Sequence, residues 1–137
     1  MTRILVVAED PLLADGLAAV LDAAGHQVVG VAKNSSSALQ LAGEGGPELV
    51  LIDVMLSGVS DGIDTAVKIQ AERPVSIVFI SAHHDPQSWE RAAAVQPVLF
   101  PSEPFSAREL LAAVTAAAEQ VTWTREVPNL DHTLRTC

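Results

Sequence analysis

The sequence LVLID, from Leu49 to Asp53, is an apolar run that ends on a carboxylate. A second apolar run, Ile4 to Ala8, leads in the same way into the acidic pair Glu9-Asp10. Runs without polar alternation are typical of parallel strands covered on both faces, and the sites of open parallel sheets form beyond the carboxyl ends of the strands. We therefore expect the three carboxylates to converge at one edge of a sheet, around a hard cation such as Mg²⁺.

The size and composition of the chain indicate one compact domain. It has 137 residues, and 49% of them are hydrophobic, which is enough for a core of its own. The net charge of -9 argues against binding to nucleic acid or to anionic membranes. The single cysteine, Cys137, excludes an intrachain disulfide, and no stretch resembles a signal peptide or a membrane span. Together these features predict a cytoplasmic protein.

Apolar runs alternate along the chain with segments of helical period, which is the pattern of a doubly wound α/β sheet. We expect five strands, at residues 3–8, 26–32, 49–53, 76–81 and 98–100. We expect helices from Pro11 to Gly25 and at 38–42, 63–71, 87–95 and 107–120, with loops at 43–47 and 57–62. Residues 121–137 have little periodicity, so they are read as a disordered tail, an added strand or helix, or a partner-binding arm.

This order of elements resembles the receiver domain of two-component response regulators, over residues 1–120. The segment LVLIDVML, from Leu49 to Leu56, and the following Asp61-Gly62-Ile63 closely fit the family's pattern. The resemblance implies a flavodoxin-like (βα)5 fold with a parallel sheet of strand order 2-1-3-4-5. It also implies that Asp53 accepts a phosphoryl group from a histidine kinase or a phosphotransfer protein.

The resemblance assigns further roles around Asp53. Glu9 and Asp10 match the acidic pair that holds Mg²⁺, with the backbone carbonyl of Met55 as a further ligand. The chemistry supports this independently, because a carboxylate can attack phosphorus while a metal offsets the charge that develops. Ser81 matches the hydroxyl residue that contacts the phosphoryl group, and Ala82 matches the small residue after it. Phe100 matches the rotating aromatic switch, and Phe105 matches the end of the Lys-Pro-Phe motif.

Glu103 departs from the family's pattern, which has lysine at this position. Two like charges about 4 Å apart repel by about 4 kcal/mol at an effective dielectric constant of about 20, so Glu103 turned toward the phosphoryl group would oppose phosphorylation. Turned outward, it would leave the site with one partner fewer. A protonated His83 or His84, just past Ser81, is a candidate for the missing positive charge, although solvated loop residues are the simpler reading.

Several assignments have a simpler structural alternative. Asp10 could cap a helix, Ser81 could be an ordinary hydroxyl at a strand end, and Phe100 and Trp89 could be packing residues. In this family the fourth helix, fifth strand and fifth helix often carry dimer or target contacts, so the resemblance implies a homodimer or a downstream protein target at that face. The sequence identifies neither the target nor the cognate kinase.

Two functions compete for this sequence. The first is a stand-alone signalling module phosphorylated on Asp53, expected because no output domain follows the last helix. The second is a phosphorylation-independent interaction domain, for which Glu103 is the motivation. An enzyme is disfavoured, beyond Mg²⁺-dependent self-phosphorylation and dephosphorylation. A haloacid-dehalogenase-type phosphatase needs an acid where Met55 stands, and a flavodoxin needs a phosphate loop where Glu9-Asp10-Pro11 stands.

Overall fold

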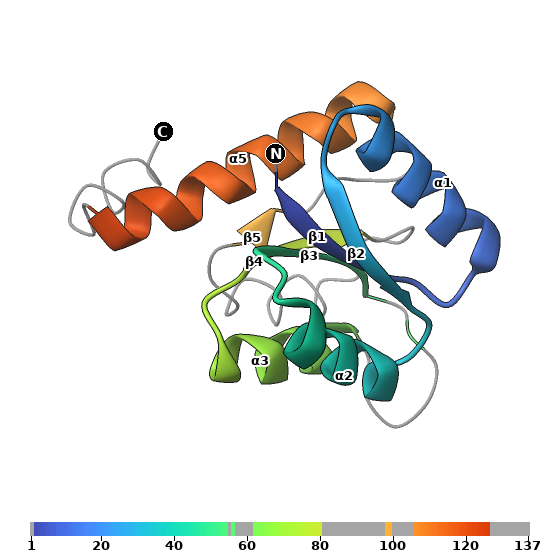
Figure 1. Ribbon diagram of the computed structural model, residues 1–137, viewed down its shortest axis with the longest axis horizontal. Coiled ribbons are helices and arrows are strands. Elements are labelled where there is room, and N and C mark those ends of the chain that lie inside the picture. Colours follow the sequence, from blue (N-terminus) through green and yellow to red (C-terminus); the bar gives the residue numbers. More distant parts are fainter. Residues whose placement is uncertain (1, 55, 57–61, 81–97, 100–105, 127–137) are drawn as a thin grey trace.

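The chain folds into a five-stranded parallel sheet with helices on both faces (Figure 1). The computed structural model describes residues 2–54, 56, 62–80, 98–99 and 106–126. The strand order, β2-β1-β3-β4-β5, confirms the order that the resemblance implied. The strands are β1 (Arg3–Val7), β2 (Gln27–Ala32), β3 (Leu49–Asp53), β4 (Ser76–Ile80) and β5 (Val98–Leu99).

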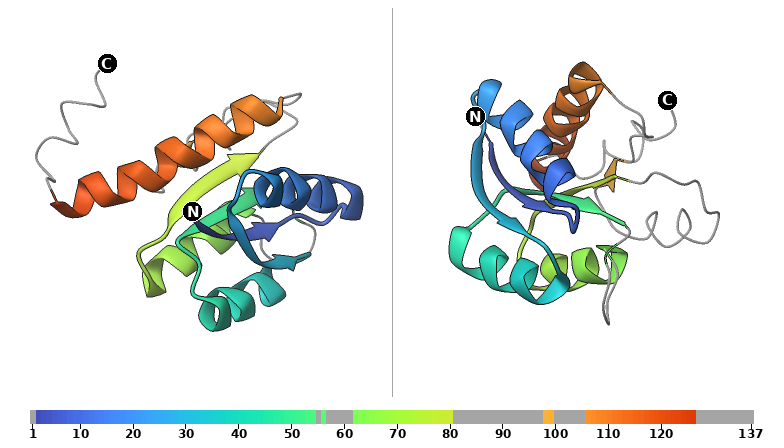
Figure 2. Two further views of the ribbon diagram at one scale, coloured as in Figure 1. Left: turned by 45° about the horizontal axis from the view of Figure 1, so that its top comes forward. Right: turned by 90° about the vertical axis from the view of Figure 1, so that its right-hand side faces the viewer.

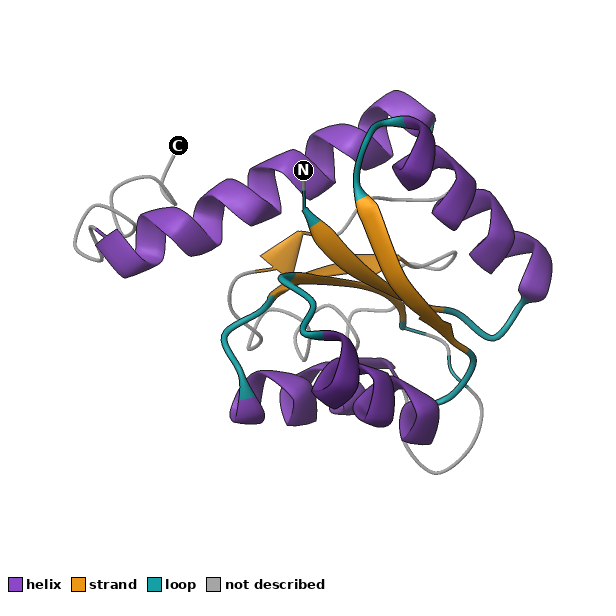
Figure 3. Ribbon diagram, in the orientation of Figure 1, coloured by secondary structure: helices purple, strands orange, loops and turns teal. Residues whose placement is uncertain are grey.

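Four helices of the described residues form the two outer layers. Figure 3 shows α1 (Pro11–Ala23) and α5 (Ala107–Glu126) on one face of the sheet, and α2 (Ser35–Gly45) and α3 (Gly62–Glu72) on the other. None of the helices in this part of the chain is both long and apolar enough to cross a membrane.

Side chains that alternate along the strands divide the core into two layers. Val6 and Leu51 pack on the side of α1 and α5, whereas Val7 and Ile52 pack on the side of α2 and α3. All four of these side chains are fully buried. Because both faces of the sheet are covered, both sets of alternating positions must be apolar, which explains the unbroken apolar runs in the sequence.

Local signals set the start of α2 and the end of α1. Asn34 caps α2: its Oδ1 accepts a hydrogen bond from the backbone N–H of Ser37 at 2.9 Å, and the Ser37 hydroxyl oxygen accepts one from the Asn34 N–H. Gly25 lies just beyond the end of α1 with a φ of +91°, a conformation that glycine adopts without steric cost. Both residues act where the sequence predicted.

Two helices are longer than the sequence predicted. The expected loop at 43–47 is wrong at its start, because α2 continues through Gly43 to Gly45 and ends at Gly46, which has a φ of +58°. Glycine in a helix costs about 1 kcal/mol relative to alanine, whereas burial of Ala38 and Ala42 on one face of α2 favours the helix. The last helix, α5, continues to Glu126 rather than ending at 120, and residues 121–126 contain no glycine or proline to stop it. In Figure 2, α5 extends past the sheet.

Several expected elements lie outside the described residues. These are residues 57–61 of the loop expected at 57–62, the helix at 87–95, the ends of the fourth and fifth strands at Ser81 and Phe100, and the tail from 127 onward. The expected loop is wrong at its end, because Gly62 is the first residue of α3.

Candidate functional site

The carboxyl ends of β1 and β3 lie side by side in the sheet. Val7 pairs with Ile52 in the parallel register, so the next residues, Ala8 and Asp53, are level with each other. Glu9-Asp10 follows Ala8 directly and begins the connection to α1. The structure thus places Glu9, Asp10 and Asp53 at one edge of the sheet, while their chemical roles stay predictions.

The three carboxylates at this edge differ in exposure and in local role. Asp53 is half-buried at the end of a strand that is otherwise buried, whereas Glu9 and Asp10 are exposed. The Oδ1 atom of Asp10 accepts a hydrogen bond from the backbone N–H of Leu12 at 3.0 Å, and Pro11 occupies the first position of α1. Asp10 therefore caps the helix, as the simpler reading of the sequence allowed. This bond orients the Asp10 carboxylate, which still has a second oxygen.

A compact metal centre is not formed by these side chains. Among the described residues, no group of three or more His, Cys, Asp or Glu is arranged to hold a metal ion. Glu9, Asp10 and Asp53 share an edge of the sheet without closing into such a group, and Met55 lies outside the described residues. The set still consists of oxygen donors, which are the ligands that Mg²⁺ prefers, so the donor chemistry fits this ion.

Backbone hydrogen bonds hold the chain just after Asp53. The N–H of Val54 donates to the carbonyl of Ile80 in β4 at 3.0 Å, and the carbonyl of Val54 accepts from the N–H of Gly62 at 3.0 Å. Gly62 is buried and is the first residue of α3. The sequence indicated Gly62 as the end of an expected loop and as part of a family pattern. Its contact with β3 could not be predicted, because the contact depends on how the chain returns to the sheet.

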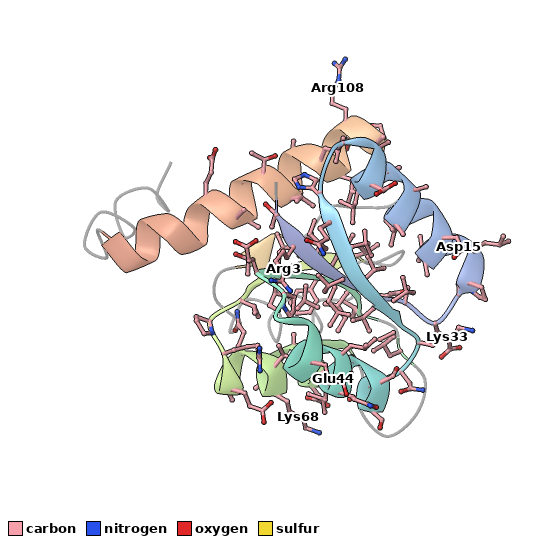
Figure 4. The ribbon with its side chains drawn as sticks, viewed as in Figure 1. Arg3, Asp15, Lys33, Glu44, Lys68 and Arg108 are labelled. Atoms are coloured by element: carbon pink, nitrogen blue, oxygen red, sulfur yellow. The ribbon has the colours of Figure 1, made fainter. Side chains whose placement is uncertain are left out.

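A basic residue lies close to the acidic edge in the fold. Lys33 directly follows β2, and the hydrogen bond from the N–H of Ala8 to the carbonyl of Ala32, at 2.9 Å, joins the ends of β1 and β2. Figure 4 shows Lys33 at this end of β2, whereas Arg3 lies at the opposite end of β1. The sequence could not assign Lys33 to the site, because it follows a strand that carries no acidic residue.

Other residues assigned from the sequence lie outside the described residues. They are Met55, Ser81, Ala82, His83, His84, Trp89, Phe100, Glu103 and Phe105.

Comparisons with known proteins identify the family. The family model for the response regulator receiver domain matches residues 4–115. The phyllosphere-induced regulator PhyR of Methylorubrum extorquens is 30% identical over 85% of this chain and 43% of its own length. The transcriptional regulatory protein PdtaR of Mycobacterium tuberculosis is 31% identical over 94% of this chain and 61% of its own length. The chain thus spans roughly half the length of the curated relatives it matches.

Solved structures agree with the sequence comparisons. The receiver domain of a modulated diguanylate cyclase from Desulfovibrio desulfuricans superposes with a TM-score of 0.84 at 30% identity, covering 89% of this chain and 97% of the other. The receiver domain of the response regulator NarL from Mycobacterium tuberculosis has a TM-score of 0.78 at 27% identity, covering 86% of this chain and 96% of the other. Fold, sequence and family model coincide over most of the chain, which belongs to the response regulator receiver domain family of two-component signalling proteins.

Proposed function

We propose that this receiver domain is switched by transfer of a phosphoryl group to the carboxylate of Asp53. The observation that carries the proposal is the level pairing of β1 and β3, which puts Asp53 beside the start of the Glu9-Asp10 turn. A carboxylate oxygen of Asp53 attacks the phosphorus of a phosphohistidine. The P–N bond breaks, and its electron pair leaves with the imidazole, which takes up a proton. The donor would be a histidine kinase or a phosphotransfer protein.

The acidic edge would serve this transfer by holding Mg²⁺. Glu9, Asp10 and Asp53, with the backbone carbonyl of Met55, are the proposed ligands, and the bound ion would neutralise charge on the phosphoryl oxygens. The helix cap orients the Asp10 carboxylate through its Oδ1 atom.

Residues outside the described part complete the proposal. Ser81 would donate a hydrogen bond to the phosphoryl group, and Phe100 would respond to it as the switch residue. The signal would pass to a protein target at the face formed by the fourth helix, β5 and α5. The expected division at residue 120 and the stand-alone action of the domain also stay proposals.

Glu103 favours a second function, an interaction domain that works without phosphorylation. A carboxylate in the place of the family's lysine removes a cation from the site and adds an anion. Under this second function, partner binding would be insensitive to Mg²⁺ and to a phosphodonor. Phosphoryl uptake by the wild-type protein separates the two functions.

Intact mass after incubation with Mg²⁺ and acetyl phosphate tests the proposal. Wild type should gain one phosphoryl group, Asp53→Asn should gain none, and Asp15→Asn, which makes the same change at an exposed site on α1, should behave as wild type. Uptake by Asp53→Asn equal to that of wild type would exclude Asp53 as the acceptor. Uptake by Glu103→Lys but not by wild type would show that the charge reversal disables the site, and would favour the second function.

A further inference from the structure

We infer that Gly62 is a positioning residue for Asp53: the absence of a side chain at Gly62 sets the backbone of β3 where the phosphoacceptor stands. Gly62 begins α3, and the chain returns to β3 at this point after the connection that follows Leu56. The geometric part of the inference is independent of the proposed phosphorylation, whereas its effect on phosphoryl uptake rests on that proposed function.

The contact between Gly62 and β3 leaves no room for a Cβ atom. A Cβ at Gly62 would lie 2.0 Å from the carbonyl oxygen of Asp53, and 2.9 Å from both the Asp53 carbonyl carbon and the Cα of Val54. All three are backbone atoms, so no change of side-chain rotamer can relieve the overlap. An alanine at this position therefore requires the backbone of β3 or of α3 to move.

Gly62 differs in this respect from Gly30 in β2 and Gly43 in α2. A Cβ at Gly30 would meet the Leu41 Cδ1 atom at 3.2 Å, which is the end of a flexible side chain, and a Cβ at Gly43 would meet nothing within 4 Å. Gly62 is also not among the glycines with positive φ in the described residues, which are Gly25 and Gly46. Its requirement for glycine is therefore steric and comes from the Asp53 peptide.

The start of α3 is held in place and cannot easily retreat. The Gly62 N–H donates to the Val54 carbonyl at 3.0 Å. The fully buried Thr65, one turn into the helix, donates from its hydroxyl to the Ser35 hydroxyl of α2 at 2.8 Å. Ile69, further along α3, is also buried in the core. Because α3 is anchored and the interior of β3 is buried, the half-buried Asp53 at the strand end is the part that a side chain at 62 would displace.

Displacement of Asp53 should slow the chemistry beyond what any loss of stability explains. Phosphoryl transfer needs the attacking oxygen in line with the bond that breaks, and a misplacement of about 1 Å can slow a reaction by about 100-fold. We therefore expect Gly62→Ala to reduce the rate of phosphoryl uptake by about 100-fold. A variant that merely loses stability, such as Ser76→Ala at the opposite edge of the sheet, should keep the wild-type rate while it remains folded.

Backbone NMR and uptake kinetics test the inference on the full chain. Gly62→Ala should shift the amide resonances of Asp53 and Val54 and should slow uptake from acetyl phosphate with Mg²⁺. Gly43→Ala, the matched glycine control, and Ser76→Ala should do neither. The inference would be overturned if the Asp53 and Val54 resonances were unchanged in folded Gly62→Ala. It would also be overturned if the rates of phosphoryl uptake by Gly62→Ala and Ser76→Ala fell in proportion to their losses of stability.

Two cases need a separate measurement: an unfolded Gly62→Ala variant, and a wild-type protein that takes up no phosphoryl group. If Gly62→Ala does not fold, hydrogen exchange of the wild-type Gly62 amide decides: slow exchange supports its bond to Val54, and exchange at the rate of an exposed amide overturns it. If wild type takes up no phosphoryl group, the proposed function fails, and the NMR comparison alone still decides whether Gly62 positions Asp53.

Discussion

At the amino edge of the sheet polar groups pair with one another across the strands, whereas at the carboxyl edge acidic side chains follow neighbouring strands. At the amino edge, the Arg3 N–H donates to Glu48 Oε1 at 2.9 Å, and the Glu48 N–H donates back to the Arg3 carbonyl at 2.9 Å. The Arg3 guanidinium also donates to the carbonyl of Gly45 near the end of α2. The Ser76 hydroxyl donates to the carbonyl of Ala117 in α5 at 2.7 Å.

The two edges of the sheet contribute differently to stability and to activity. Hydrogen bonds at the amino edge link β1 to α2 and to Glu48 just before β3, and β4 to α5, and they favour the folded state. At the carboxyl edge the three carboxylates carry like charge, so each raises the electrostatic energy of the others. Substitutions at the carboxyl edge should therefore change activity more than stability, and substitutions at the amino edge should do the reverse.

The largest expected effect is the separation of activity from stability in Asp53→Asn. Phosphoryl uptake should be lost completely, because the amide nitrogen and oxygen that replace the carboxylate do not attack phosphorus. The free energy of unfolding should change by less than about 1 kcal/mol, since one like charge is removed from a half-buried position. Intact mass measures the phosphoryl uptake, and urea denaturation measures the free energy of unfolding. A large loss of stability in this variant would mean that Asp53 supports the fold as well as the chemistry.

Ser76→Ala should show the opposite behaviour at the amino edge. Ser76 is fully buried, and loss of its hydrogen bond to the Ala117 carbonyl should lower the free energy of unfolding by about 1 to 3 kcal/mol. The rate of phosphoryl uptake should equal that of wild type at a temperature where both are folded. A reduced uptake rate in fully folded Ser76→Ala would mean that the two edges are coupled.

Asp10 allows the two properties to be separated at a single residue. Asp10→Asn keeps a side chain that caps helices as well as aspartate, so stability should change little, whereas Asp10→Ala should lose about 1 kcal/mol. Both variants remove a proposed Mg²⁺ ligand, so the Mg²⁺-dependent uptake rate should fall by at least about tenfold in each. Thermal denaturation and uptake kinetics give the two readouts. Full uptake by Asp10→Asn would mean that Asp10 caps α1 but is not needed as a Mg²⁺ ligand.

The smallest expected effect is a gain of stability in Gly43→Ala. Gly43 lies on the exposed face of α2, with open space where a Cβ would stand. Alanine should raise the free energy of unfolding by about 0.5 to 1 kcal/mol through its higher helix propensity, without changing uptake. A loss of stability in urea denaturation would show that α2 does not continue through Gly43 in solution.

Much of the fold could be predicted because the local and tertiary signals agree. Apolar runs such as Leu49 to Asp53 form strands, and Asp10 and Asn34 begin the helices that follow them. The extent of α2 could not be predicted, because its last glycines suggested a loop. They are helical in the structure, where the burial of Ala42 against the core favours the helix. The end of α5 was missed because periodicity fades after residue 120 although no residue there stops a helix.

For the site, the amino-acid sequence was enough to predict the residue types and the strand ends that carry them. Asp53, Glu9 and Asp10 follow apolar runs, and unbroken runs of that kind belong to buried parallel strands whose carboxyl ends share an edge. The order that makes β1 and β3 neighbours came from the family resemblance, whereas the packed fold shows that Lys33 lies at the end of the strand beside β1 and that Gly62 lies against the Asp53 peptide. Such contacts join residues far apart in the chain, and the packing of whole helices and strands sets them.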